Sequence, residues 1–206
     1  MAIVITVAQQ KGGTGKTTLA ANLAAALAPE RRVALLDIDP QRSLTRWHAL
    51  RPERAPALSF SDVSGWRLGA ELDRLKRAHD VVLIDSPPQI DTDARLAIRG
   101  ADIVLVPVQP SPPDVWAAEG TLKLAAAEKR PAAVALNRLP ASGKLRESVI
   151  AQLHASGHRL LTATVGNRTG FASAFAKGLG VTEAAPRSIA ANELRALLAE
   201  LLELAG

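Results

Sequence analysis

Two lysines, three glycines and three threonines stand close together near the start of the chain, within residues 10–18 (Q-K-G-G-T-G-K-T-T). Glycines let successive backbone N–H groups turn toward phosphate oxygens, which a Cβ would obstruct. Lys16 can reach the β- and γ-phosphates of a nucleotide, and the Thr17 hydroxyl can bind Mg²⁺. This spacing therefore predicts a phosphate-binding loop. The residues expected to hold the nucleotide are Gly12, Gly13, Thr14, Gly15, Lys16, Thr17 and Thr18.

The segments on either side of this loop are those that such a site requires. The apolar, β-branched run at residues 3–7 predicts a strand, and the Ala/Leu-rich run at residues 19–28 predicts a helix. A helix that begins at the loop adds the positive end of its dipole to the phosphate site. A glycine-rich turn with incidental lysines is the alternative interpretation, and the flanking strand and helix make it the weaker one.

Carboxylates follow two further apolar runs. Residues 33–36 are followed by D-I-D-P-Q, with Asp37 and Asp39, and residues 81–84 are followed by D-S-P-P, with Asp85. The carboxyl ends of parallel strands lie where nucleotides bind in open α/β sheets. Four apolar residues that end in an aspartate form a Walker B pattern, whose carboxylate holds a metal ion. For Asp39, capping of the following helix is the alternative role.

The loop departs in one place from the usual G-x-x-x-x-G-K-[ST] pattern. Gln10 stands where the first glycine is expected, and Lys11 adds a second lysine. In this form, K-G-G-T-G-K-T-T, the loop resembles the deviant Walker A loop of the ParA/MinD family of ATPases. The D-x-D-P-Q and D-S-P-P runs are similar to later motifs of that family, in the same order.

The resemblance implies roles for several residues of the ATP and Mg²⁺ site. Lys11 would cross a dimer interface to reach the nucleotide of the partner subunit, beside the phosphate contact expected of Lys16. Asp39 would position the attacking water. Thr17, Asp37 and Asp85 would surround Mg²⁺.

Two later segments extend the resemblance. The stiff run at residues 108–114 (V-Q-P-S-P-P-D) is similar to the proline-rich segment of short, plasmid-type ParA proteins, near the nucleotide and the dimer face. The alternative is a rigid loop or a ligand for aromatic grooves. The predicted strand at residues 132–136 ends in Asn137, which the resemblance implies reads the adenine edge, since an amide both donates and accepts.

Charge is distributed unevenly along the chain, whose net charge is +5. Residues 138–187 contain seven lysines and arginines against two glutamates, so this segment alone carries the whole excess. Such a balance suits a polyanionic partner, although a solvated basic surface explains it equally well. The resemblance implies nonspecific DNA as that partner, and Arg168 and Lys177 are the candidate phosphate contacts.

Composition bounds the class of protein. We expect the 206 residues to form one domain, and the absence of cysteine excludes disulfides and Cys-ligated iron–sulfur clusters. No apolar run reaches the length of a membrane span, and no signal peptide is evident, which predicts a cytoplasmic protein. Association with the nucleoid is what the resemblance implies. The predicted last helix, residues 189–204, has a net charge of −2, so we expect its leucines to pack in the core rather than on a membrane.

Together these patterns predict an α/β P-loop NTPase with a mostly parallel, twisted sheet that is flanked by helices on both faces. By resemblance, ATP–Mg²⁺ would drive homodimerisation, the dimer would bind DNA, and slow hydrolysis to ADP, stimulated by a ParB-like or adaptor partner, would release it. The protein would thereby partition or position a plasmid, a chromosome region or a protein cluster. A MinD-like regulator of division and a metabolic P-loop enzyme that uses ATP on a small substrate are the alternatives.

Two further expectations concern secondary structure. Residues 160–165 predict a last strand, and Asp91 and Asp93 are expected to cap the helix that follows them.

Overall fold

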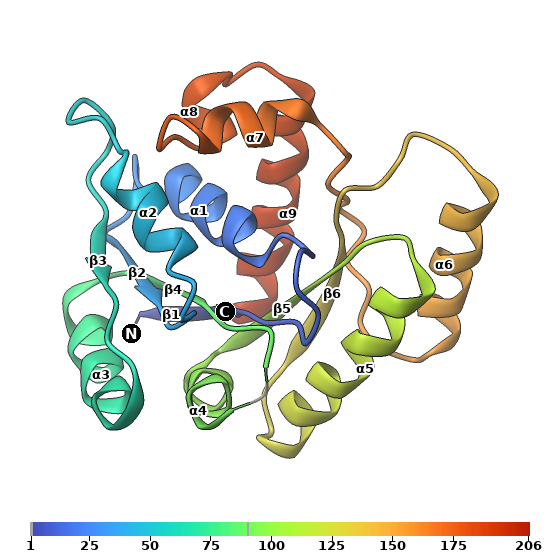
Figure 1. Cartoon of the computed structure of the whole chain (residues 1–206), viewed down its shortest axis with the longest axis horizontal. Coiled ribbons are helices and arrows are strands. Elements are labelled where there is room, and N and C mark those ends of the chain that lie inside the picture. Colours follow the sequence, from blue (N-terminus) through green and yellow to red (C-terminus); the bar gives the residue numbers. More distant parts are fainter. Residues whose placement is uncertain (1, 90) are drawn as a thin grey trace.

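Six parallel strands form the centre of the computed structural model, which describes residues 2–89 and 91–206 (Figure 1). Their order across the sheet is β3-β2-β4-β1-β5-β6. The strands are β1 (Ile3–Val7), β2 (Val33–Asp37), β3 (Ser59–Ser61), β4 (Val81–Asp85), β5 (Ile103–Val108) and β6 (Ala132–Leu136). The α/β fold with a parallel sheet is therefore as the sequence predicted.

Helices cover both faces of this sheet (Figure 1). One face packs against α1 (Lys16–Leu27), α2 (Ser43–Ala49), α7 (Thr169–Phe175), α8 (Val181–Ala184) and α9 (Ile189–Ala205). The other face packs against α3 (Leu68–Ala78), α4 (Thr92–Gly100), α5 (Pro112–Ala127) and α6 (Lys144–Ala155). A short 3₁₀ turn, Gly65–Arg67, precedes α3.

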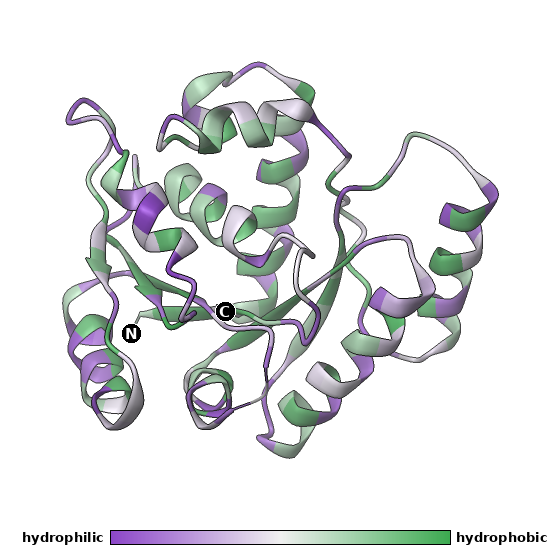
Figure 2. Cartoon of the chain, viewed as in Figure 1, coloured by the Kyte–Doolittle hydropathy of each residue, from purple (hydrophilic) through white to green (hydrophobic). Residues whose placement is uncertain are grey.

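The register of the strands brings the candidate residues to one edge of the sheet. Because successive side chains of a strand point to opposite faces, Leu35 packs toward α1 while Leu36 packs toward α3. Figure 2 shows apolar residues along these central strands. In the ladder Val7 and Asp37 both pair with Asp85. The loop that follows β1 therefore lies beside the carboxylates that end β2 and β4.

The strand predicted at residues 160–165 is absent from the described sheet. This segment runs beside β6, where the N–H groups of Leu161 and Val165 donate to β6 carbonyls and only isolated bridges form. Between them the N–H groups of Thr162 and Ala163 both donate to the Glu200 carboxylate, at 2.9 Å each. A side chain of α9 thus takes the N–H of Ala163, which a continuous ladder with β6 would need.

The capping prediction for α4 is half right. The Asp91 carboxylate accepts a hydrogen bond from the N–H of Ala94 at 2.8 Å, as an N-cap should. The Asp93 carboxylate instead accepts from the N–H of Gly65 at 2.7 Å, so it holds the 3₁₀ turn rather than its own helix.

The last helix, α9, packs in the core as its pattern predicted. Its apolar side contacts the sheet through the buried residues Leu194, Leu197, Leu198 and Leu201. Across residues 2–89 and 91–206, none of the helices combines the length and the apolar character that crossing a bilayer demands.

Candidate nucleotide-binding site

The glycine loop lies between β1 and α1, and two of its glycines adopt conformations that other residues avoid. Gly13 has φ +80° and Gly15 has φ +95°. A Cβ on Gly15 would also lie 2.4 Å from Nδ2 of Asn137, so this glycine is required twice over. Nothing in the described chain lies within 4 Å of a Cβ on Gly12, so the expectation that it leaves room for phosphate stays a prediction.

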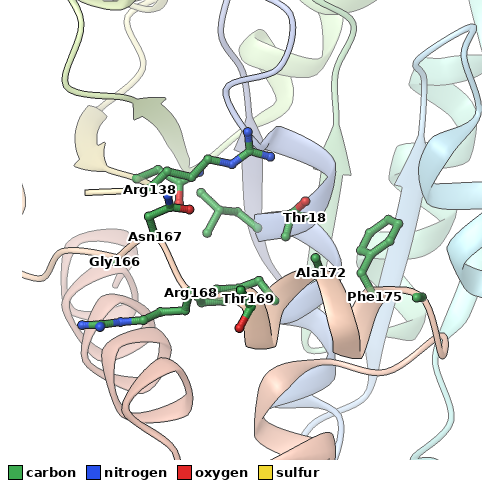
Figure 3. A pocket seen from close by; sticks show the side chains of 12 residues that line it. Thr18, Arg138, Gly166, Asn167, Arg168, Thr169, Ala172 and Phe175 are labelled. Atoms are coloured by element: carbon green, nitrogen blue, oxygen red, sulfur yellow. The ribbon is translucent and has the colours of Figure 1, made fainter. Parts of the chain in front are cut away.

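Two adjoining cavities open at this loop. The first, about 330 Å³, is lined by the loop and by Asp39. The second, about 460 Å³, lies between Asn137 and α7 (Figure 3). Arg138 and Phe175 line both cavities, which therefore meet at these residues. The arrangement suits a ligand with a polyphosphate at one end and a flatter, partly apolar group at the other.

Lys16 places a buried ammonium group under the first cavity. Its side chain is almost fully buried, and Nζ donates to the carbonyl of Lys11 at 3.3 Å. Burial lowers the pKa of Lys16, and the negative charges of Asp85 and Asp39 offset part of this effect. Phosphate oxygens in the cavity would supply negative charge that stabilises the buried ammonium group.

Asp85 is fully buried, and neither of its carboxylate oxygens has a hydrogen-bond partner within the described chain. Burial raises its pKa to about 8, and the neighbouring Thr17 hydroxyl offsets only part of this rise. Residues 2–89 and 91–206 contain no cluster of three or more metal-binding side chains. An unpartnered carboxylate beside a hydroxyl fits Mg²⁺ that keeps waters and takes its other ligands from phosphates. Thr17 and Asp85 are the residues that would hold it.

Asp37 has a different set of partners. Oδ1 accepts from the N–H of Asp39 at 3.1 Å, and Oδ2 accepts from the N–H and hydroxyl of Thr45 at 2.8 and 2.7 Å. The carboxylate therefore fixes the loop between β2 and α2. Its predicted part in the Mg²⁺ shell stays a prediction.

Asp39 lines the first cavity and is 9% exposed. Its Oδ1 accepts from the N–H of Gln41 at 2.9 Å, which closes a local turn. The N-cap of α2 is Arg42 at φ +53°, so the alternative role of Asp39 as the helix cap is wrong. Its place in the lining of the phosphate cavity leaves the role in positioning water a prediction.

Asn137 is buried at the carboxyl end of β6 and contacts the glycine loop. Its Nδ2 donates to the carbonyl of Thr14 at 2.7 Å. One amide hydrogen is thus committed to the loop, while the side chain also lines the second cavity. Its predicted contact with adenine has to use the remaining amide atoms.

The two residues predicted to contact DNA have different surroundings. The Arg168 guanidinium points away from the second cavity (Figure 3), and its Nη2 pairs with Oε1 of Glu193 at 2.7 Å. Lys177 is exposed just after α7. Neither is brought to the phosphate loop, and DNA binding by both stays a prediction.

Sequence reasoning missed how firmly the proline-rich segment is attached to the loop. The Gln109 amide donates to the carbonyl of Gly13 at 2.7 Å, and the Gln9 amide donates to the carbonyl of Asp114 at 3.3 Å. The side chain of Lys11 forms an ion pair with Asp114. The lone carboxylate in the run S-P-P-D was the signal available in the sequence.

Comparisons with known proteins bear on the family and the fold of this chain. The model of the CobQ/CobB/MinD/ParA nucleotide-binding domain matches residues 5–181. The maintenance of carboxysome distribution protein A of Halothiobacillus neapolitanus is 31% identical over 215 residues, covering 98% of this chain and 97% of the relative. The chromosome-partitioning ATPase Soj of Thermus thermophilus is 31% identical over 239 residues, covering 96% and 94%. The solved cell division ATPase MinD of Pyrococcus furiosus superimposes with a TM-score of 0.83 over 99% of this chain and 100% of that one, at 20% identity.

Proposed function

Because this chain belongs to the CobQ/CobB/MinD/ParA family and is a ParA/MinD-type P-loop ATPase, we propose that it is a nucleotide-operated positioning protein. In this proposal it binds ATP with Mg²⁺, pairs with a second copy, binds DNA without sequence preference and is released by slow, partner-stimulated hydrolysis.

The observation that carries the proposal is the contrast between the two lysines of the loop. Lys16 is almost fully buried beneath the first cavity, where it serves the nucleotide of its own subunit. The side chain of Lys11 is 41% exposed and lines neither cavity. In the proposal this cation contacts a nucleotide held by a second copy.

The chain's own residues divide the work on ATP. Lys16 and the loop N–H groups bind the phosphates, and Thr17 and Asp85 hold Mg²⁺, which neutralises phosphate charge when bound. Asp39 orients the attacking water. Asn137 and the second cavity receive the adenosine. Removal of the γ-phosphate then withdraws the charge that Lys11 contacts across the dimer.

DNA binding follows from pairing. Two copies join two basic segments, each with an excess of five positive charges at residues 138–187, and two linked weak sites bind more tightly than one. The cargo would be a protein cluster or a DNA region, since the relatives named above distribute carboxysomes and partition chromosomes.

The experiment measures oligomeric state and DNA retention of the purified chain with ATP, ADP or no nucleotide. We expect a dimer and DNA retention only with ATP and Mg²⁺, and a loss of retention between about 50 and about 300 mM KCl. Asp39→Ala should bind ATP, fail to hydrolyse it and accumulate the DNA-bound dimer. Full-speed hydrolysis by a monomer that never binds DNA would instead favour a metabolic P-loop enzyme.

A further inference from the structure

The ion pair between Lys11 and Asp114 joins a half-exposed cation to a buried anion. The carboxylate of Asp114 is 1% exposed, whereas the Lys11 side chain is 41% exposed. A buried carboxylate is costly without a compensating charge, so Lys11 stabilises Asp114 more than the reverse. Because Lys11 is partly exposed, its ammonium group can turn to another anion, whereas the buried Asp114 carboxylate cannot move to another cation.

The other contacts of Asp114 leave it dependent on this cation. Its Oδ2 accepts from the hydroxyl of Ser111, whereas its Oδ1 is buried and unpartnered within the residues that the structure describes. Removal of Lys11 would leave one hydroxyl to compensate a whole negative charge.

Contacts between α5 and the loop fix the position of Asp114 relative to Lys11. The Gln109 amide binds the carbonyl of Gly13, and Gln10 packs so closely on Gly120 of α5 that a Cβ there would lie 2.3 Å from its amide nitrogen. Asp114 therefore cannot follow Lys11 if its ammonium turns outward. An anion on a second copy would therefore compete with Asp114 for this cation.

We propose that Asp114 is a positioning residue that holds Lys11 on its own subunit and so restrains pairing. Pairing, on which this inference rests as part of the proposed function, exchanges the Asp114 carboxylate for the phosphates of a second copy. A triphosphate compensates the exchange better than a diphosphate because it carries more charge. After hydrolysis Asp114 recaptures Lys11, which favours separation of the subunits.

The test compares dimer dissociation constants by analytical ultracentrifugation, with Mg²⁺ and either a slowly hydrolysed ATP analogue or ADP. Asp114→Asn removes the charge and keeps the shape. We expect it to lower the dimer dissociation constant with the analogue about tenfold and to produce dimer with ADP where the parent is monomeric. Nucleotide affinity should be unchanged, because Asp114 lines neither cavity.

A second variant, Ser111→Ala, should raise the dimer dissociation constant. Ser111→Ala removes a donor from the Asp114 carboxylate, which then depends more on Lys11, so we expect pairing to weaken severalfold. Asp114→Glu keeps the charge and should behave as the parent does. Glu128→Gln is the matched control, because it breaks an ion pair with Arg99 at the other end of α5 and should change nothing.

The outcomes separate this inference from the proposed function. If the parent chain does not pair with the ATP analogue, the proposed function fails. If the parent pairs and Asp114→Asn pairs equally or less well, the inference fails. Weaker pairing in both Asp114→Asn and Ser111→Ala would reduce Asp114 to a structural residue in the first turn of α5, where Ser111 is the N-cap. If Asp114→Asn does not fold, unchanged or stronger pairing in Ser111→Ala overturns the inference, and weaker pairing with an unchanged free energy of unfolding supports it.

Discussion

Charged residues differ in burial and pairing between the carboxyl ends of the strands (the carboxyl edge) and their amino ends (the amino edge). At the carboxyl edge Lys16 and Asp85 are both buried. Lys16 donates to a backbone carbonyl, and the Asp85 carboxylate has no hydrogen-bond partner among the described residues. At the amino edge Arg32 and Asp80 are exposed, and their side chains pair at 2.7 Å. Each end thus has a basic residue and an aspartate, but at the carboxyl ends they are buried and form no ion pair within the described residues, whereas at the amino ends they are exposed and paired.

This difference indicates that the carboxyl edge is the one that binds a ligand. A buried charge without a partner destabilises the fold, so it persists where something else supplies the partner. Exposed pairs such as Arg99 with Glu128 add little stability and call for no ligand. Cations also suit the ends of helices at the amino edge, where Lys76 and Arg77 lie in the last turn of α3.

The largest expected effect is on nucleotide affinity at the carboxyl edge. Lys16→Ala should weaken ATP binding at least about 100-fold, because it removes a buried cation from the phosphate cavity. Lys76→Ala, which removes a cation from the amino edge, should leave the affinity unchanged. Isothermal titration calorimetry with ATP and Mg²⁺ checks both. Equal affinities for the two variants would remove the phosphate site from this loop.

The second prediction asks whether burial alone marks a functional charge. The Glu183 side chain is also mostly buried, at 10% exposed, but it pairs with Arg51 at 2.8 Å and accepts from the N–H of Gly180 at 2.8 Å. Glu183→Gln should therefore lower the free energy of unfolding by about 2 kcal/mol or more. Asp85→Asn replaces a buried carboxylate that forms no ion pair by a neutral group of the same shape, so it should not destabilise the nucleotide-free protein, yet it should abolish Mg²⁺-dependent hydrolysis.

Urea unfolding without nucleotide and an ATPase assay check this pair of variants. A reversed order, with Asp85→Asn the less stable and still active, would show that Asp85 is an ordinary core residue. In that case the missing partner would not indicate a metal site.

Local pattern made the carboxyl edge predictable. The glycine loop, the strand before it and the helix after it are determined within one short stretch, and an aspartate after each of two apolar runs places Asp37 and Asp85 side by side once the sheet is parallel. What sequence could not give is the competition between side chains from distant segments. Glu200 accepts the N–H of Ala163 that a seventh strand needed, and Asp114 pairs with the lysine that was expected to reach a second subunit.

The third prediction concerns which basic region binds DNA. Lys177→Ala should weaken DNA binding of the ATP-bound protein severalfold and reduce its salt dependence, because each phosphate contact releases counterions. Lys76→Ala serves as the amino-edge control and should change neither. Fluorescence anisotropy over a salt series checks both. If Lys76→Ala has the larger effect, DNA binds the amino edge and the two edges share the function.

The smallest expected effect is at the exposed pair of the amino edge. The hydrogen bond from the Arg32 side chain lowers the pKa of Asp80 to about 2, with a further contribution from the N–H of Arg32. A lowered carboxyl pKa contributes stability that is present above the unfolded value of 3.8 and is lost as the pH falls toward 2. Asp80→Asn should therefore lower Tm only slightly at pH 7, and the difference should vanish near pH 2 and shrink in high salt. Calorimetry across this pH range checks it, with the exposed Asp73→Asn as control; a large difference independent of pH would mean that the amino edge also depends on a particular charge.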